Sequence, residues 1–433
     1  MWLKYNCLTA INKTVLYIMK IKNLHSLALI STFLFAITSC NTEKESGKLE
    51  VISVDNAYNN QAAINASDCF SKIRYVKLET TDESLVGNKP LVWISGNRLI
   101  VTSSQKQCLA FDKETGKFIC SIGHIGNDPE GSQSLSGWLN VASSRIYFPK
   151  GNGNNVVYDT DGNFIGTQKD PELTDGFYGI DNYDYLNSEI LVKHLPATDK
   201  KPDRIVLYRD TSILALFPSH GESVNRLSGS VDNIQEISVM KNKERDIINI
   251  KYKDGMQNSL VPSEQIFWHL GDNLFFRELF NDTIYKVEQQ GLLPVKRLDF
   301  GSMSWAREDR YNPEKDNAIY PLDVYENERV LWLRFIVNFF HPDKWEMYNA
   351  VYDKKDGTVK VSPFDDGIND DLNGFISLQP SFSSHTGEFA QIVSVEDIQN
   401  WFDENSDKEG LPESVEMLRN ISDEDNPVVV LME

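Results

Sequence analysis

Basic residues are scarce in this chain relative to acidic ones, and no polybasic block occurs. The 433 residues include 43 lysines and arginines against 63 aspartates and glutamates, for a formal net charge of −20 at pH 7. Nucleic-acid binding depends on a basic surface that neutralises phosphates, so we expect no nucleic-acid partner. The acidic surface would instead attract cationic partners.

Histidine is also scarce, and the motifs of common enzyme classes are missing. None of the seven histidines stands four residues from another, as on a zinc-binding helix, and HExxH, G-x-S-x-G and Walker sequences are absent. The nearest calcium-like string, "NDDLNG" at Asn369–Gly374, lacks a first aspartate and has Pro380 where a bidentate glutamate belongs. We expect no cofactor, no metal and no catalytic residue. Whether the protein is an enzyme stays open, and a non-enzyme is favoured.

The same stretch of chain is rich in aspartate. We expect these carboxylates to form a solvated acidic loop rather than a binding site, as charge runs usually do. The four aspartates concerned are Asp365, Asp366, Asp370 and Asp371.

The N-terminal apolar run is too short to cross a membrane. Leu27–Ile37 has 11 residues, against about 20 for a bilayer span. Lys20 and Lys22 precede it, which is typical of a signal peptide. We interpret residues 1–39 as this signal peptide, with Met19 as the natural start.

A cysteine follows the apolar run at the position expected for lipid attachment. The residues "ITSC" (Ile37–Cys40) resemble a bacterial lipobox, in which a branched apolar residue and two small residues precede the cysteine that is acylated. The resemblance implies that Cys40 begins the mature protein and that residues 40–48 form a lipidated tether. The alternative is a plain secretory signal with a chance cysteine. The expected location is the bacterial cell envelope, as an outer-membrane lipoprotein facing the periplasm or the cell surface.

A disulfide framework is not expected. Cys7 and Cys40 belong to the leader, so an odd number of cysteines remains: Cys69, Cys108 and Cys120. In the hairpin "AFDKETGKFICSIG", a turn centred between Glu114 and Thr115 would place Phe111 opposite Phe118 and Leu109 opposite Cys120. Cys108 would then point to the other face of the sheet from Cys120, because side chains alternate along a strand.

That hairpin pattern recurs along the chain. An aromatic residue, an aspartate, polar residues and a glycine precede a second apolar arm, and glycine accepts the positive φ of a tight turn. The aromatics recur about every 48 residues, a period typical of propeller blades. They are Phe111, Tyr158, Tyr208, Tyr252, Tyr285 and Tyr352. We predict an all-β, six-bladed β-propeller with about four antiparallel strands per blade, as a single domain over residues 49–433.

Short helices are expected only near the C-terminus. Ser394 and Asp397 form a candidate capping box, and Pro412–Arg419 is a second helix candidate. The apolar run Val428–Leu431 predicts a closing strand that completes the first blade. The "AFDKETGKFICSIG" hairpin is expected to form the inner half of a blade.

Four stretches, in this order, carry a family resemblance. They are "IRYVKLETTDESLVG" (Ile73–Gly87), "FDKETGKFICSIGHIGNDPEG" (Phe111–Gly131), "NDTIYKVEQQGLLPVKRLDFG" (Asn281–Gly301) and "EDNPVVVLME" (Glu424–Glu433). With the lipobox, the chain resembles the six-bladed, TolB-like β-propeller lipoproteins of Bacteroidetes, many of which are known only as a domain of unknown function. The sequence departs from that pattern after "GNDPEG", where no aromatic follows, and at "DLNG", where a glycine pair is expected.

Binding candidates gather after the first hairpin. His124, Asn127 and Asp128 lie in a glycine-bearing loop, and Trp138 near a loop end could stack on a sugar. We expect a lipid-anchored, monomeric binding or scaffold module for a protein, a peptide or a glycan. The alternative is a hydrolase or lyase with a metal-assisted site in the central funnel. Three or more inward-pointing Asp, Glu, Asn or His side chains from several blades would favour the enzyme.

Overall fold

The computed structural model describes the chain from Leu49 onward, with internal gaps. Omitted within residues 49–433 are 104–105, 173–181, 196–203, 219–233, 241–246, 256, 261–264, 279–280, 306–314, 316, 340 and 342–343. The predicted signal peptide and Cys40 therefore lie outside the described residues. None of the helices in the described part is long and apolar enough to span a membrane.

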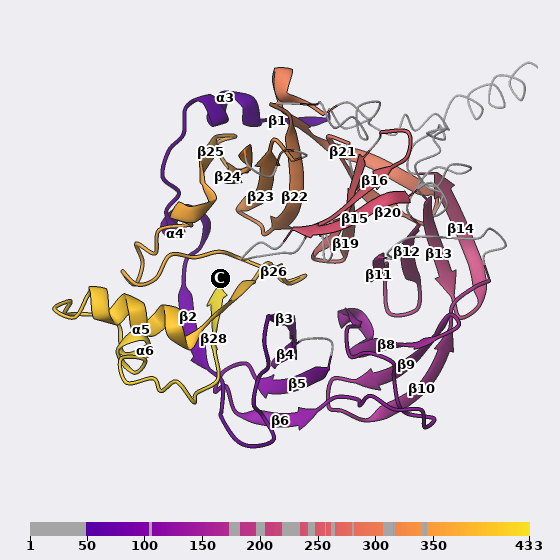
Figure 1. The fold of residues 1–433 in the computed structure, drawn as a ribbon, viewed down its shortest axis with the longest axis horizontal. Helices are drawn as coiled ribbons and strands as arrows, with labels where there is room; N and C mark the ends of the chain where they lie inside the picture. The colour runs from indigo at the N-terminus through magenta and orange to yellow at the C-terminus, as the bar shows by residue number, and fades with distance from the viewer. Residues whose placement is uncertain are drawn as a thin grey trace, which may run out of the picture. The chain divides into compact units, whose positions relative to one another are not determined.

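Six four-stranded antiparallel sheets are arranged in a ring (Figure 1), which confirms the predicted six-bladed β-propeller. We number them sheets 1 to 6. Sheet 1 is β3(Pro90–Ser95), β4(Arg98–Ser103), β5(Gln107–Asp112) and β6(Phe118–Ser121); sheet 2 is β7(Trp138–Asn140), β8(Arg145–Gly151), β9(Asn154–Asp159) and β10(Phe164–Lys169). Sheet 3 is β11(Asn182–Tyr185), β12(Leu191–Leu195), β13(Arg204–Arg209) and β14(Ser212–Pro218); sheet 4 is β18(Phe267–Leu270), β19(Asn273–Arg277), β20(Thr283–Glu288) and β21(Gly291–Asp299). Sheet 5 is β22(Ile319–Glu326), β23(Val330–Val337), β24(Glu346–Asp353) and β25(Val359–Pro363); sheet 6 is β26(Phe382–Ser383), β27(Phe389–Val393), β28(Val428–Met432) and β2(Ile73–Lys77).

A further three-stranded sheet lies in the connection from sheet 3 to sheet 4. It consists of β15(Ile234–Met240), β16(Ile247–Tyr252) and β17(Gln257–Leu260). It is not a seventh blade, because sheets 3 and 4 pack directly on each other: Val192 and Leu207 share one buried cluster with Phe276. We call it the inserted sheet.

The hydrophobic core lies between neighbouring sheets. Each seam of the ring has its own buried apolar cluster; Phe111 of sheet 1, for example, packs with Val429 of sheet 6. Burying such side chains is the main favourable contribution to folding. First strands of neighbouring sheets contact one another: β26 contacts both β3 and β22, β18 contacts β22, and β7 contacts β11. In Figure 1, β3, β11 and β26 lie towards the centre of the ring.

The two ends of the ring carry different loops. Because the strands of a sheet alternate in direction, the turns after the first and third strands share one end, which we call the turn end. The connections from each sheet to the next lie at the opposite end, which we call the connection end. The inserted sheet and the loop after β6 belong to the connection end.

Both chain ends contribute to sheet 6, which closes the ring. β28 pairs with β27 on one side and with β2 on the other, with Tyr75 opposite Val430. The prediction that the last strand completes the first blade is therefore wrong. Instead β2, from the N-terminal part of the chain, completes the last blade as its outermost strand.

The "AFDKETGKFICSIG" hairpin forms the outer half of its blade, not the inner half, because it supplies β5 and β6. Phe111 faces Phe118, as predicted, with ring centroids 5.7 Å apart. Gly116 has a φ of +68°, and a Cβ there would lie 2.0 Å from the carbonyl oxygen of Lys77, so the turn requires glycine.

Helices flank the sheets. β1(Glu50–Ser53) pairs in parallel with β21, α3(Val54–Asn59) packs against β25, and α4(Ala66–Cys69) follows. Near the C-terminus are α5(Val395–Glu404) and α6(Glu413–Glu416). Half of the predicted capping box is present: Ser394 Oγ accepts the backbone N–H of Asp397 at 3.1 Å, whereas Oδ2 of Asp397 accepts from the Ser394 hydroxyl instead of its backbone N–H.

Candidate functional site

The loop after β6 brings two of the predicted binding residues together. His124 Nε2 lies 2.8 Å from Asp128 Oδ2, and both side chains are about half exposed. This hydrogen bond is the main reason why the pKa of Asp128 lies below its ordinary value. Asn127 lies between them in sequence and is exposed. The structure therefore presents a paired imidazole and carboxylate at the connection end.

Backbone contacts hold this loop in one conformation. Asp128 Oδ1 accepts the N–H groups of Glu130 and Gly131, each at 3.0 Å, and Lys150 Nζ donates to the carbonyl of Asp128 at 2.8 Å. A Cβ on Gly131 would lie 2.5 Å from the carbonyl oxygen of Gly126, so only glycine permits this close approach. The loop is preorganised, although its internal contacts already satisfy most of its polar groups.

Trp138 lies apart from that loop, on the innermost strand of sheet 2. Its indole stacks on Tyr147 at 4.1 Å and on Tyr183 of sheet 3 at 5.8 Å, with interplanar angles of 4° and 5°. Both faces of the ring are therefore used inside the protein. Stacking on a sugar, the role we expected for this residue, would require one of these tyrosines to move.

A second polar group, which we call the inner cluster, lies at the turn end. It consists of Asp184, His269, Asp272 and His385, contributed by β11, β18, the turn after β18 and the turn after β26. His269 Nε2 lies 2.7 Å from Asp184 Oδ1, and the imidazole stacks on Tyr185 at 4.1 Å. Three innermost strands or their turns thus contribute ionisable side chains to one end of the ring.

A backbone hydrogen bond joins two of these segments across an intervening sheet. The Gly271 N–H of sheet 4 donates to the carbonyl of His385 of sheet 6 at 2.7 Å, although sheet 5 lies between those sheets in the ring. Gly387 packs beside Asn327 in the first turn of sheet 5. The turn Ser384–Glu388 therefore extends over the inner end of sheet 5 and brings His385 to the cluster.

The two imidazoles of the inner cluster have different environments. Burial first, and then the charge of His269, lower the pKa of His385, so His385 is neutral at pH 7. Within the part of the chain that the structure describes, Nδ1 of His385 is buried without a hydrogen-bond partner. His269, by contrast, is held by a carboxylate. Asp272 is exposed, and its charge acts on both His385 and Tyr185.

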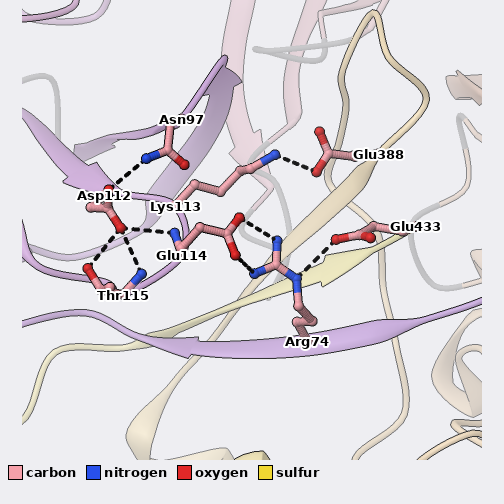
Figure 2. Close-up of polar contacts among 8 residues, drawn as sticks. All are labelled: Arg74, Asn97, Asp112, Lys113, Glu114, Thr115, Glu388 and Glu433. Carbon is pink, nitrogen blue, oxygen red and sulfur yellow. Dashed lines mark hydrogen bonds and ion pairs between the residues drawn. The ribbon is translucent and has the colours of Figure 1, made fainter.

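Ion pairs at the seam between sheets 6 and 1 fix the turn that carries His385. Lys113 Nζ lies 2.8 Å from Glu388 Oε1 (Figure 2), and both side chains are largely buried. The same turn of sheet 1 bears Asp112, whose Oδ2 accepts a hydrogen bond from Asn97 Nδ2 at 2.7 Å. The position of His385 therefore depends on a contact between sheets 6 and 1.

Sequence reasoning missed the inner cluster. Asp184, His269 and His385 are far apart in the chain, and no spacing signals that they meet. The only available signal was their place beside turns that end innermost strands. Over the described ranges, no group of three or more His, Cys, Asp and Glu side chains is arranged to hold a metal ion.

The fold is a six-bladed β-propeller, with polar side chains gathered at both ends of the ring. The chain belongs to the family described as Domain of unknown function (DUF4934), whose model matches residues 49–433. No curated protein matches the sequence.

A solved structure shows a similar fold. The chain is similar to a Bacteroides fragilis protein named as a candidate exported protein, with 16% identity, a TM-score of 0.59, and coverage of 89% of this chain and 99% of that one. The WD40 repeats of RRP9 (9% identity, 86% and 99% coverage, TM-score 0.37) and the WD40 domain of SCAP from fission yeast (8% identity, 83% and 98% coverage, TM-score 0.31) are more distant. Only the first of these similarities is strong enough to bear on the fold.

Proposed function

We propose that this protein is a lipid-anchored binding module of the bacterial cell envelope, whose inner cluster receives a protein, a peptide or a glycan. The observation that carries the proposal is the convergence of Asp184, His269 and His385 at the turn end, with Asp272 exposed beside them. The similar Bacteroides fragilis protein is named as a candidate exported protein, and this chain carries a lipobox at Cys40. Both observations support an extracytoplasmic, membrane-attached location, in keeping with the TolB-like lipoproteins that the sequence resembles.

The chemistry of the cluster favours ligands that donate hydrogen bonds. The Asp272 carboxylate and a neutral His385 imidazole both accept them. Ammonium and guanidinium groups of peptides, and hydroxyl groups of glycans, are such donors. The net charge of −20 raises the local concentration of cationic partners further.

Array binding with matched variants tests the proposal. Purified protein is applied to glycan and peptide arrays as wild type, as Asp272→Asn with His385→Ala, and as Asp210→Asn, a control in a different turn at the same end. We expect binding that the double variant loses and the control keeps. Blank arrays, together with no crosslink from a photoreactive residue at position 272 in intact cells, would contradict the proposal.

An acid–base enzyme is the second candidate, and one observation favours it. The inner cluster holds two imidazoles in different environments, one paired with a carboxylate and the other with a lowered pKa, and enzymes use such differences to separate an acid from a base. Turnover of chromogenic ester, lactone or glycoside substrates that His269→Gln and His385→Gln both abolish would instead establish the enzyme.

A further inference from the structure

One face of sheet 5 carries polar side chains where buried apolar ones are usual. Asp323 of β22 lies opposite Arg334 of β23, and Arg334 lies opposite Asn349 of β24. Asn349 in turn lies opposite Ser362 of β25, so that one row crosses all four strands. None of these residues is more than 2% exposed. We call the four residues the buried polar row.

The buried polar row faces the seam between sheets 5 and 6. Side chains two residues apart on a strand share a face. Trp332 therefore lies on the same face as Arg334, and Val351 on the same face as Asn349. Trp332 and Val351 pack in one buried cluster with Phe389 of sheet 6. The row is thus enclosed between two neighbouring blades.

The residues just before β26 cover the row from the side of sheet 6. Nη2 of Arg334 donates to the carbonyl of Pro380 at 3.2 Å. Nε2 of Gln379 donates to the carbonyl of Phe364, which follows Ser362 by two positions. The Phe364 ring also lies over the Arg334 guanidinium, with 4.7 Å between its centroid and Cζ. The Gln379 amide therefore lies close to the end of the row that carries Ser362.

Three side chains at this seam have buried polar atoms that no protein group satisfies. Among the described residues, Nδ2 and Oδ1 of Asn349, Oγ of Ser362 and Oε1 of Gln379 are buried without a hydrogen-bond partner. Native proteins pair nearly all buried polar groups, either with protein or with ordered water. An unpaired group loses its hydration without compensation, which is costly. The seam therefore calls for a ligand that bonds these atoms.

The chemistry of the atoms favours water over an ion. The Asn349 amide nitrogen and the Ser362 hydroxyl can donate hydrogen bonds, whereas Oδ1 of Asn349 and Oε1 of Gln379 can only accept them. An anion would be repelled by these acceptors. The one carboxylate of the row, Asp323, is already paired with Arg334 at 3.4 Å, which disfavours a metal cation. Water both donates and accepts, and buried waters typically make about three hydrogen bonds.

We propose that the buried polar row binds an internal water molecule at the seam between sheets 5 and 6, with Asn349, Ser362 and Gln379 as its partners. This water joins β24 and β25 to the segment that leads through β26 into the turn Ser384–Glu388, which carries His385. Sheets 5 and 6 are then bonded to each other at the point where their own polar atoms do not meet. The inference uses only contacts inside the ring, so it does not depend on the proposed function.

Removing the Ser362 hydroxyl tests the proposal through the sign of its effect on stability. Ser362→Ala should lower the urea midpoint of unfolding, because the water loses a partner. If the hydroxyl were unpaired in the native protein, its removal would leave the midpoint unchanged or raise it. The matched control is Ser84→Ala, at an equally buried hydroxyl that donates to the Glu79 carbonyl at 2.7 Å. The loss in Ser362→Ala should be at least about half of the loss in this control.

Crystals of the wild type and of Asn349→Leu test the water directly. At a resolution that reveals ordered waters, we expect one peak within about 3.2 Å of Asn349 and Ser362 in the wild type. The variant should lack this peak, because leucine cannot bond water. A direct hydrogen bond between Asn349 and Ser362, with no peak beside them, overturns the proposal. A peak with the shorter contacts of a metal ion overturns it as well.

Discussion

Arg74 and Glu433 lie 359 positions apart in the chain, yet Nε of Arg74 donates to Oε1 of Glu433 at 3.0 Å. The guanidinium also donates from both terminal nitrogens to Glu114, at 2.8 and 3.3 Å (Figure 2). One side chain thus joins the N-terminal strand, the last residue of the chain and the outer turn of sheet 1. This network stabilises the seam where the ring closes.

Arg74→Ala should lower the free energy of unfolding by about 1 kcal/mol, because a bidentate ion pair at a half-buried site exceeds an isolated surface pair. Arg74→Lys should recover only part of the loss, since an ammonium group cannot form the two parallel bonds. Urea denaturation measures both. The control is Arg98→Ala, which removes the single pair with Asp161 between sheets 1 and 2. A loss in the control as large as in Arg74→Ala would contradict a special role of the closing seam.

Tyr75, on the same strand β2 as Arg74, makes a second long-range contact. Its hydroxyl donates to Oδ2 of the buried Asp370 at 2.5 Å. Asp370 therefore does not belong to a solvated acidic loop as we expected, and Asp371 is bonded to Ser67. Burial, followed by the charge of Asp370, raises the pKa of Tyr75 far above its ordinary value.

Tyr75→Phe should cost about 2 kcal/mol, because the buried carboxylate of Asp370 loses a donor. Tyr352→Phe is the matched control: its hydroxyl donates to Glu50 at 2.6 Å, and that carboxylate is partly exposed, so water can replace the lost donor. Denaturation by urea should show less than about 1 kcal/mol for the control. Equal losses in the two variants would mean that burial of Asp370 is unimportant.

The blade number was predictable from spacing, although one of the six aromatics was misassigned. Phe111, Tyr158, Tyr208, Tyr285 and Tyr352 all lie on the third strand of a blade. Tyr252 lies on β16 of the inserted sheet, and the third strand of sheet 6 contains no aromatic residue. The predicted number of six blades was therefore right only because the hairpin of the inserted sheet, which is not a blade, was counted in place of sheet 6, which lacks the aromatic. Local hairpin chemistry does not reveal whether a hairpin joins the ring.

The register between strands was harder to predict than which strands pair, because the sequence pattern gives no sign of a β-bulge. The bulge between Ala110 and Phe111 places Ala110, not Leu109, opposite Cys120. Cys108 and Cys120 consequently lie on the same face of sheet 1, in the same buried region. The inner cluster was unpredictable for a related reason: its members meet through ring closure, a relationship between segments that no local pattern records.

The reactivity that we expect of the three described thiols depends on how deeply each is buried, not on how close they lie to one another. All three described cysteines are free, although the reason that we predicted for this, opposite faces of the sheet, is wrong. Burial, followed by the charge of Asp68, raises the pKa of Cys69 to about 12, and burial raises that of Cys108 even further. Cys120 is half-exposed. Because the thiolate is the reactive form, iodoacetamide at pH 8 should label Cys120 in the native protein and the other two only on unfolding.

Peptide mass spectrometry after a short labelling pulse identifies the modified cysteine. A denaturant series supplies the control, since all three thiols should react above the unfolding midpoint. Labelling of Cys108 as fast as Cys120 in the native protein would show that the seam between sheets 1 and 2 opens.

Asp112 makes the first hairpin sensitive to acid. Its Oδ1 accepts hydrogen bonds from the hydroxyl and the N–H of Thr115, both at 2.8 Å, and these bonds hold the pKa of Asp112 below the ordinary value of 3.8. A carboxylate whose pKa is lower in the folded state contributes stability above its unfolded pKa, and this stability is lost as pH falls through the folded pKa.

Asp112→Asn keeps an acceptor oxygen but removes the charge. The difference in thermal midpoint between wild type and variant should therefore be largest above pH 5 and shrink towards pH 3. Asp112→Ala, which also lacks the acceptor, should be less stable than Asp112→Asn at every pH. A difference between wild type and Asp112→Asn that stays constant from pH 6 to pH 3 would rule out this role for the charge.

Deleting Ile234–Leu260 tests whether the inserted sheet belongs to the ring. Residues 219–233 and 261–266 remain to join β14 to β18, and the packing of Val192 on Phe276 between sheets 3 and 4 is untouched. We expect a single cooperative thermal transition with a midpoint within about 5 °C of wild type, because no residue of the deleted segment belongs to a buried cluster between the described sheets of the ring.

The matched deletion is Gln107–Ser121, a hairpin of a true blade. It removes Leu109 and Phe111 from the cluster between sheets 6 and 1, and it also removes the turn that bonds Arg74. Losing two fully buried side chains costs several kcal/mol, an amount comparable with the whole stability of many domains, so this variant should not fold. If the first deletion also abolished the cooperative transition, the inserted sheet would be part of the ring's core.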